Sequence, residues 1–445
     1  MGKTILFTPV GGTDPISATN YYEGAILHIC RYYKPDQVIL YMSKEMLAYQ
    51  KQDNRYLYCL QKLSDVIEHE MEYEVIERDE LTKVHEFDYY YEDFRNLIHN
   101  IYATMGEDDR LLINISSGTP AMKSGLLVLQ VLAEFPATLI QVSTPERKIN
   151  EHRHEGYDVE VLWELNQDNM PDAKNRCKEV TCPSLEKLKK EEIIKKHIKA
   201  YDYRAALAVA DTLKNEDTNR YRKLLEMATK RMLLDLEKVD KIRNETGFDC
   251  IPVKTSSDRK LFEYVLCMDI KLKRGEYADF IRSITPVLVD LYELVLKKQC
   301  GININDYCET KRRGRDYIRV WSKNKLENTT VQQELDNAFG GDFKGREIYS
   351  VHLMYLVDAF SDNLKIKNLV SDLRTVEERI RNDAAHDIIS VTEEAIEKKT
   401  GFKPQKIMQM IRELFGFTGI HVKKEYWDSY DEMNNQLINI INAEE

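Results

Sequence analysis

The chain has 445 residues, of which 43% are hydrophobic and 31% are charged, as in ordinary globular proteins. A chain of this length rarely folds around a single hydrophobic core, so we expect two or three domains. The formal net charge of −11 argues against a protein that coats long nucleic acid without sequence preference, because such proteins tend to be basic.

The sequence shows no sign of a membrane or an exported protein. No apolar run approaches the roughly eighteen residues of a membrane span, and the N-terminus lacks the basic flank and apolar stretch of a signal peptide. Among the eight cysteines only Cys177 and Cys182 lie close together, and no CxxC pair exists. We therefore expect a cytoplasmic protein with reduced thiols and no metal site.

The first 150 residues alternate between strand-like and helical patterns. Strands are predicted at Ile5–Val10, Gln37–Met42, Tyr73–Glu77, Leu111–Ile115 and Thr138–Ser143. Helices are predicted between them at Tyr21–Tyr33, Met46–Glu68, Phe87–Ala103 and Pro120–Glu134. This alternation predicts a parallel, Rossmann-like α/β sheet that binds ligands at the carboxyl ends of its strands. His28, inside an amphipathic helix, is expected to be structural.

Polar segments follow two of these strands. The first contains Gly11, Gly12, Thr13 and Asp14, where adjacent glycines allow a sharp turn and a close approach to a ligand. The second runs from Asn114 through Ser116, Ser117, Gly118, Thr119 and Pro120. Thr119 is expected to cap a helix that begins at Pro120, which leaves N–H groups and hydroxyls for phosphate or ribose oxygens. Neither a dinucleotide fingerprint nor a Walker loop is present, so each segment alone is equally consistent with a well-capped loop.

After residue 150 the pattern changes. Residues 151–183 read as a polar linker with some residual strand, and helices dominate beyond Leu185, for example Leu185–Tyr201, Tyr203–Leu213 and Tyr221–Val239. The chain thus divides near residue 180 into an α/β half and an all-α half.

A basic stretch interrupts the helical half between Lys311 and Lys325. Its basic residues are interleaved with Tyr317 and Trp321, as a surface for single-stranded RNA requires. A solvated loop explains the same residues equally well.

The most informative helical segment is 366–389. Apolar residues at helical spacing define a buried stripe: Ile366, Leu369, Leu373, Val376, Ile380 and Ala384. Asn382 and His386 lie roughly 200° and 240° around the helix from Ile380, so they share a face turned away from that stripe, and Arg381 lies on the stripe's flank. Arginine beside histidine suits metal-free RNA cleavage, in which imidazole moves a proton and guanidinium stabilises phosphoryl charge. For a bare Arg–His spacing, however, a charged surface helix is the favoured explanation.

The N-terminal segments together resemble CARF domains. The resemblance rests on GGTDP (Gly11–Pro15), GAILHI (Gly24–Ile29), NISSGTPAM (Asn114–Met122) and QVSTP (Gln141–Pro145). Specifically, these segments look like the CARF domains of the Csm-type ancillary ribonucleases of type III-A CRISPR systems, which sense cyclic oligoadenylate. Relatives often carry Asn where Gly12 stands here.

The motif RNxxAH at Arg381–His386 resembles that of HEPN ribonucleases, and the same family has CARF followed by HEPN. The resemblance implies a CARF domain at 1–180 and a helical region at 181–445, with a linker to about 285 and a HEPN domain from about 286. It implies that Arg381, Asn382 and His386 are the nuclease residues. Arg379 has a permitted distance to His386, but no Asn follows it.

The resemblance also implies the ligands and partners. We expect a homodimer that cleaves single-stranded RNA in antiviral defence without a cofactor, leaves 2′,3′-cyclic phosphate ends, and does not bind DNA or membranes stably. The activator is expected to be cyclic oligoadenylate, with the hexa-adenylate favoured over the tetra-adenylate. It is expected to bind at Gly11–Asp14 and at Asn114 with Ser116–Pro120, and Thr119 is a candidate for slow cleavage of the ring.

Two other hypotheses remain at this point. In the first, the chain is a non-catalytic nucleotide sensor that dimerises through its helical domain. In the second, it is a Rossmann-like metabolic enzyme, although the dinucleotide fingerprint is missing.

Overall fold

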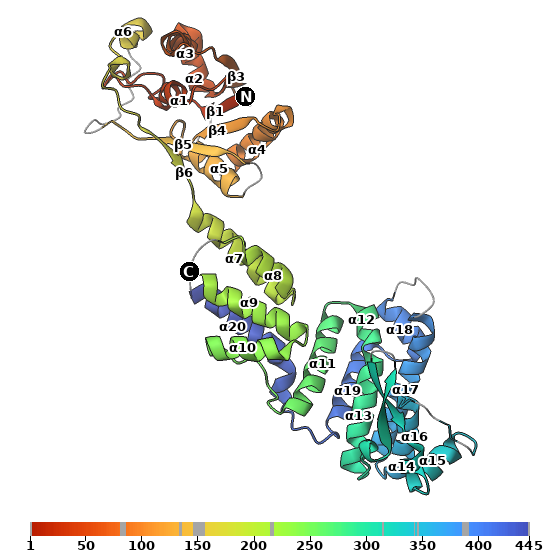
Figure 1. Cartoon of the computed structure of the whole chain (residues 1–445). Helices are drawn as coiled ribbons and strands as arrows, with labels where there is room; N and C mark the ends of the chain where they lie inside the picture. The colour runs from red at the N-terminus through yellow and green to blue at the C-terminus, as the bar shows by residue number, and fades with distance from the viewer. Residues whose placement is uncertain are drawn as a thin grey trace. The chain divides into compact units, whose positions relative to one another are not determined.

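The computed structural model describes residues 2–80, 86–132, 136–145, 156–213, 218–313, 316–341, 343–344, 347–384 and 391–443. Within these ranges the side chains of 256–257, 316 and 380–384 are not described. The chain forms two compact units, Met1–Lys189 (unit 1) and Lys190–Glu445 (unit 2) (Figure 1). None of the described helices is long and apolar enough to cross a membrane. All eight cysteines are free.

Unit 1 is an α/β structure. Its strands are β1 (Thr4–Pro9), β2 (Gln37–Ser43), β3 (Glu72–Arg78), β4 (Arg110–Asn114), β5 (Thr138–Val142) and β6 (Cys177–Val180). Its helices are α1 (Ala25–Tyr33), α2 (Lys44–Asp53), α3 (Arg55–Ile67), α4 (Phe87–Thr104), α5 (Pro120–Val131) and α6 (Val159–Glu164), with a 3₁₀ turn, η1, at Gln167–Asn169. The five strands expected from the sequence are confirmed, with ends shifted by no more than about one residue.

The six strands form one sheet in the order β3-β2-β1-β4-β5-β6. β1 to β5 are parallel, as predicted, whereas β6 pairs antiparallel with β5 and makes the sheet mixed. Alternate residues of β1 face opposite cores: Leu6 packs with α1 and α3, and Phe7 packs with α4 and α5. The sheet is therefore covered on both faces, and its carboxyl edge remains for a site.

The prediction of one continuous helix over Met46–Glu68 is wrong in one respect, because the chain forms two helices there. Asn54 adopts a left-handed conformation with φ 56°, ends α2 and begins α3. The Oε1 atom of Gln50 accepts a hydrogen bond from the Tyr56 N–H at 3.1 Å across this break. Apolar periodicity continues through such a corner, so the sequence pattern did not reveal it.

Unit 2 is mainly helical and is built around one hydrophobic core. It contains most of α7 (Pro183–Lys199), then α8 (Tyr203–Ala210), α9 (Asn219–Met232), α10 (Leu236–Thr246), α11 (Ser256–Lys273), α12 (Tyr277–Arg282), α13 (Ile284–Gln299), α14 (Lys323–Leu326), α15 (Thr330–Ala338), α16 (Ser350–Phe360), α17 (Leu364–Ala384), α18 (Glu393–Thr400), α19 (Pro404–Phe415) and α20 (Ser429–Ala443). Two 3₁₀ turns, η3 and η4, lie at Ile304–Asp306 and Lys424–Asp428.

The expected all-α half is confirmed as mainly helical, with one exception. Strands β7 (Cys308–Arg313) and β8 (Asp316–Trp321) form an antiparallel hairpin, which crosses the front of the helices in Figure 1. The basic composition of this segment favoured a surface loop, but the β-branched and aromatic residues of β8 favour a strand.

A buried ion pair joins three helices of unit 2. The Arg231 guanidinium, on α9, donates to both carboxylate oxygens of Glu263 on α11 at 2.8 and 3.1 Å. It also donates to the Ser429 hydroxyl at the start of α20 and lies 3.9 Å from the centre of the Tyr430 ring. Both charged side chains are completely buried. The pair thus ties the end of the chain to the beginning of unit 2.

Replacing Arg231 with Met should destabilise the protein by about 3–5 kcal/mol, because it leaves the Glu263 carboxylate buried without its partner. The double variant Arg231→Met/Glu263→Leu should recover a large part of this loss, since no uncompensated charge remains. Urea unfolding followed by circular dichroism measures both. A double variant as unstable as the single one would contradict this explanation.

Candidate functional site

The loops that follow β1 and β4 touch each other through glycine backbone. A Cβ atom on Gly11 would lie 2.7 Å from the amide nitrogen of Gly118, closer than real contacts allow. Gly118 itself has φ +85°, a conformation that favours glycine. The two polar segments singled out in the sequence are therefore neighbours at the carboxyl edge of the sheet, because β1 and β4 pair directly.

Asp14 is buried and holds the first loop together. Its carboxylate accepts the N–H groups of Gly11 at 2.9 Å and Ile26 at 3.2 Å. Burial raises the pKa of Asp14, although hydrogen bonds from Ser117 and these N–H groups oppose the rise. A Cβ on Gly24 would meet the Asp14 carboxylate at 2.3 Å, so glycine is required there. Asp14 shapes the loop from inside.

Asn114 holds the second loop, which follows β4, together by hydrogen bonds. Its amide donates to the hydroxyls of Thr8 at 2.9 Å and Ser117 at 3.0 Å, and its carbonyl oxygen accepts the Ser116 N–H at 2.8 Å. The Ser116 hydroxyl in turn accepts the N–H of Val142 on β5 at 2.7 Å. Asn114 and Ser117 are buried, whereas Ser116 is partly exposed.

Thr119 caps helix α5, as predicted from the sequence. Its hydroxyl accepts the Met122 N–H at 3.4 Å, and Pro120 occupies the first helical turn. This arrangement turns the N-terminal end of α5 toward the carboxyl edge of the sheet, where partial positive charge favours an anion.

A pocket of about 300 Å³ opens at this edge. This volume is at the small end of the range for ligand pockets. Most of its lining is polar and comes from four places along unit 1: Thr13, Ser17, Asn20, Tyr22, Glu23, Gly24 and Ala25; Ile115, Ser116 and Lys123; Gln141 to Pro145; and Arg176.

Of the ten residues expected to bind the ligand, Thr13 and Ser116 line the pocket. The other eight (Gly11, Gly12, Asp14, Asn114, Ser117, Gly118, Thr119 and Pro120) lie in the same two loops, outside that lining, and Asp14, Asn114 and Ser117 are buried.

The pocket has two basic residues that sequence reasoning missed, Lys123 and Arg176. Lys123 lies one helical turn after Thr119 and could have been found from that spacing. Burial lowers the pKa of Lys123, while the Asp14 carboxylate raises it in part. Arg176 comes from a segment far along the chain, and no local pattern marks it.

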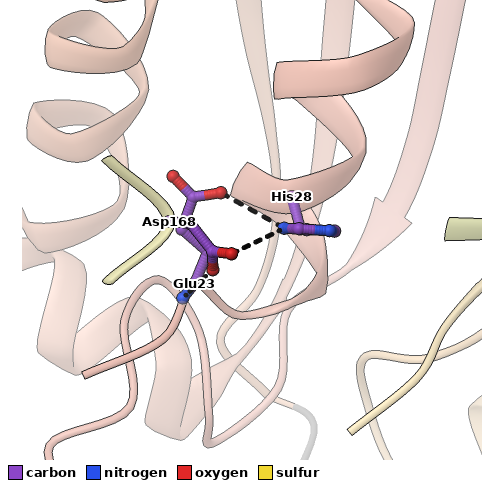
Figure 2. Close-up of side chains that lie close together, drawn as sticks. All are labelled: Glu23, His28 and Asp168. Atoms are coloured by element: carbon purple, nitrogen blue, oxygen red, sulfur yellow. Dashed lines mark hydrogen bonds and ion pairs between the residues drawn. The ribbon is translucent and has the colours of Figure 1, made fainter. Parts of the chain in front are cut away.

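Arg176 is held by a buried cluster of polar side chains formed by Glu23, His28 and Asp168 (Figure 2). The Arg176 guanidinium donates to the Asp168 carboxylate at 2.7 Å and to the backbone carbonyl of Glu23 at 3.1 Å. The backbone N–H of Arg176 donates to Nε2 of His28 at 3.0 Å, and Nδ1 of the ring faces Glu23 at 3.5 Å and Asp168 at 3.7 Å. His28 is thus structural, as expected.

The same three residues present a donor set that a metal ion could use. The two carboxylates of this set already have partners, however. The Glu23 carboxylate accepts hydrogen bonds from Nε and Nη2 of Arg31, and the Asp168 carboxylate accepts one from the Glu23 N–H at 2.9 Å. Burial alone would raise the pKa values of Glu23 and Asp168, but His28 and the arginines lower both below their ordinary values. The cluster is best explained as a hydrogen-bonded network that fixes Arg176 at the pocket.

In unit 2, helix α17 carries the Arg–Asn pair of the sequence motif that resembles that of HEPN ribonucleases. The stripe residues Ile366, Leu369, Leu373 and Val376 are buried, as predicted, and the Tyr292 hydroxyl donates to the Val370 carbonyl at 2.9 Å. Arg381 and Asn382 belong to the last turn of α17, but their side chains, like those of Ile380 and Ala384, are not described. His386 lies outside the described residues.

The turn before Arg381 is anchored by a buried carboxylate. Glu377 is 3% exposed, accepts the hydroxyl of Ser350 at the start of α16, and pairs with Arg374 at 3.1 Å. Arg379, the alternative partner for His386, donates instead to the Lys399 carbonyl at the end of α18 at 3.3 Å. This contact gives Arg379 a structural partner.

His352 on α16 is a buried histidine, and its ring contacts the hairpin through Trp321. Its Nδ1 accepts the indole N–H of Trp321 at 3.0 Å and the backbone N–H of Tyr349 at 3.2 Å, and Phe343 packs edge-on at 5.0 Å between ring centres. Burial lowers the pKa of His352 to about 4, with a contribution from the charge of Arg374.

Models of known families match three stretches of the chain. The Cas_Csm6 CARF domain matches residues 72–177, the CRISPR-associated protein Csm6 6H domain matches 180–232, and the Cas_Csm6 HEPN domain matches 250–438.

Curated relatives cover nearly the whole chain. The chain is 30% identical to the CRISPR system endoribonuclease Csm6 of Mycobacterium tuberculosis, over 98% of each chain. It is 24% identical to that of Streptococcus thermophilus, over 98% of this chain and 99% of the relative. A solved structure, Enterococcus italicus Csm6 bound to cyclic hexa-2′-fluoro-hexa-dAMP, shares the fold with a TM-score of 0.66 and 18% identity, over 98% of this chain and 100% of that one.

Lowering the pH from 7.5 to 4.5 should destabilise unit 2 by about 2 kcal/mol through His352. Its folded pKa of about 4 lies below the unfolded value of about 6.5, so its contribution is complete above pH 6.5 and is lost as the pH falls toward 4. Urea unfolding followed by tryptophan fluorescence measures this. His352→Gln keeps an acceptor for Trp321 and should flatten this part of the profile. An unchanged profile would assign the pH dependence to other groups.

Proposed function

Since the chain belongs to the Csm6 family of CRISPR-associated endoribonucleases, we propose that cyclic oligoadenylate activates its cleavage of single-stranded RNA. Sensing is assigned to unit 1 and cleavage to unit 2, in the cytoplasm. The observation that carries the proposal is the polar pocket at the carboxyl edge of the sheet, which has two basic side chains. Relatives named endoribonucleases favour this function over a non-catalytic sensor or a metabolic enzyme.

The pocket has the chemistry that a phosphate-linked nucleotide requires. Lys123 and Arg176 supply positive charge, Thr13 and Ser116 supply hydroxyls, and the start of α5 supplies a helix N-terminus. Its volume of about 300 Å³ suits a part of a ring better than a whole one. The Enterococcus relative was solved with a cyclic hexa-nucleotide analogue, which supports hexa-adenylate over tetra-adenylate as the activator here.

For cleavage, Arg381, Asn382 and His386 are assigned to the reaction. His386 would move the proton of the attacking 2′-hydroxyl, Arg381 would stabilise the charge on the phosphoryl oxygens, and Asn382 would orient substrate or imidazole. This chemistry needs no metal ion and leaves 2′,3′-cyclic phosphate ends.

A homodimer would complete both sites. One Arg and one His form a sparse set for phosphodiester cleavage, and two-fold symmetry would supply a second copy of each. The small pocket of one chain is consistent with a ring that two chains share. Light scattering tests this assembly, and a fully active monomer would contradict it.

Slow cleavage of the activator is a further part of the proposal. Thr119, at the start of α5, would act by positioning the ring's own 2′-hydroxyl in line with the neighbouring phosphate, since the loop offers no strong base. Chromatography of cyclic hexa-adenylate after incubation with His386→Ala protein tests this, and an intact ring would contradict it.

Arg381→Ala and His386→Ala should each reduce RNA cleavage by about 100-fold or more, since each removes a group that acts only in the transition state. Cleavage of a fluorogenic RNA measures the rate, and chromatography of the products should show 2′,3′-cyclic phosphate ends. Activity of the unmodified protein should persist in EDTA, and strict dependence on a divalent ion would contradict the mechanism. Arg379→Ala, beside the motif, is the matched control.

Lys123→Met should raise the concentration of cyclic hexa-adenylate needed for half-maximal activation by about 10-fold or more, because it removes a positive charge from the pocket. Asp14→Ala tests binding less cleanly, since the buried Asp14 carboxylate shapes the loop. RNA cleavage is titrated with tetra- and hexa-adenylate rings. Lys62→Met, an exposed lysine on α3, should leave the titration unchanged. Equal titrations for Lys123→Met and the unmodified protein would remove Lys123 from the site.

A further inference from the structure

The β7–β8 hairpin has a buried base and an exposed outer half. At the base Cys308 pairs with Trp321, and both side chains are buried. Lys325 donates to the Cys308 carbonyl at 2.6 Å, and Arg319 pairs with Glu293 on α13. The segment is therefore anchored on unit 2 at one end. Trp321, considered above as part of an RNA surface, belongs to the core.

The outer half is basic and carries an exposed aromatic ring. Lys311, Arg312 and Arg313 are exposed on β7, and Tyr317 on β8 is 73% exposed, the highest value among the exposed large hydrophobic residues described. Arg312 is the cross-strand partner of Tyr317, so their side chains share one face of the ribbon. Lys311 and Arg313 face the other side, because neighbouring residues of a strand alternate.

Two of these basic residues form ion pairs with carboxylates that water can reach. Lys311 pairs with Glu309 at 3.0 Å and Arg313 with Glu347, and the four side chains are 29–70% exposed. Ion pairs of this kind contribute little to stability, so a phosphate can replace the carboxylate at small cost. In a chain with a net charge of −11, three consecutive cations at the outer half of a ribbon form a local site for a polyanion.

The hairpin lies close to the nuclease helix through a short series of contacts. Val320 on β8 forms a β-bridge with Glu347, and the Ile348 N–H donates to the Arg319 carbonyl at 3.4 Å. Two residues later Ser350 begins α16 and donates to Glu377 on α17. Glu377 precedes Arg381 by four residues, which is about one helical turn. Strand β8 is thus connected, through residues 347–350 and Glu377, to the turn that precedes the Arg–Asn pair.

We propose that the outer half of the hairpin binds the substrate RNA beside the cleavage site, with Tyr317 stacking on a base and Lys311, Arg312 and Arg313 contacting phosphates. This inference rests on the proposed function for the identity of the substrate. Stacking on an aromatic ring is independent of the base, and backbone contacts add affinity without sequence preference. The hairpin accordingly contributes to binding of RNA and leaves the chemical step to the residues at the end of α17.

The test separates binding from cleavage. Tyr317→Ala and the double variant Lys311→Gln/Arg312→Gln should each raise the KM for a fluorogenic single-stranded RNA about 5- to 10-fold at saturating activator and change kcat less than about 2-fold. Tyr317→Trp should restore the KM. The double variant Lys223→Gln/Lys241→Gln removes the same charge from exposed positions on α9 and α10 and should behave like the unmodified protein.

Binding is measured independently by fluorescence anisotropy of a labelled, uncut RNA with His386→Ala protein. The hairpin variants should weaken binding to the same extent, and the lysine–arginine variant should lower the salt dependence of log K by about 1 to 2. Unchanged anisotropy and KM would overturn the hairpin inference and leave the proposed function standing. If the unmodified protein fails to cleave RNA, the proposed function falls, and anisotropy still decides whether the hairpin binds RNA.

Discussion

Unit 1 depends on one steric constraint, the direct packing of Gly11 against the backbone of Gly118. Parallel pairing of β1 with β4 brings the two loops to the same edge, and only the absence of a Cβ lets them come so close. Asp14 and Asn114 then hold the loops by hydrogen bonds from inside. The pocket lies beside these two loops, and Thr13 and Ser116 of the loops form part of its lining.

The sequence was most informative where a residue acts on its own neighbours. The cap at Thr119, the helix start at Pro120 and the buried stripe of α17 depend on spacings of a few residues, and the cap, the helix start and the stripe as far as Val376 are confirmed. The pairing of β6 with β5 and the contribution of Arg176 depend on residues brought together by folding, and local patterns carry no trace of them. The hairpin was missed because its composition resembles a solvated loop.

The polar residues of the two segments that carry the CARF resemblance, Gly11–Asp14 and Asn114–Pro120, divide into two groups by burial. Asp14, Asn114 and Ser117 are buried and form hydrogen bonds with backbone and side-chain groups of unit 1, whereas Thr13 and Ser116 line the pocket. A recognisable motif therefore marks the loop architecture as much as the ligand contacts. The basic residues that complete the pocket, Lys123 and Arg176, lie outside the signature itself. Recognition of a family and identification of a binding site are thus different problems, even within two short segments.

The return of α20 to α9 makes unit 2 hard to divide by recombination. Tyr203 on α8 donates to Asn434 on α20 at 2.7 Å, and the Arg231–Glu263 pair is completed by Ser429. A chimera that exchanged only α12 to α19 would keep these partners, whereas one that exchanged α20 alone would replace the groups that Tyr203 and Arg231 contact. Helices α8, α9, α11 and α20 therefore form one structural module that is interrupted in sequence.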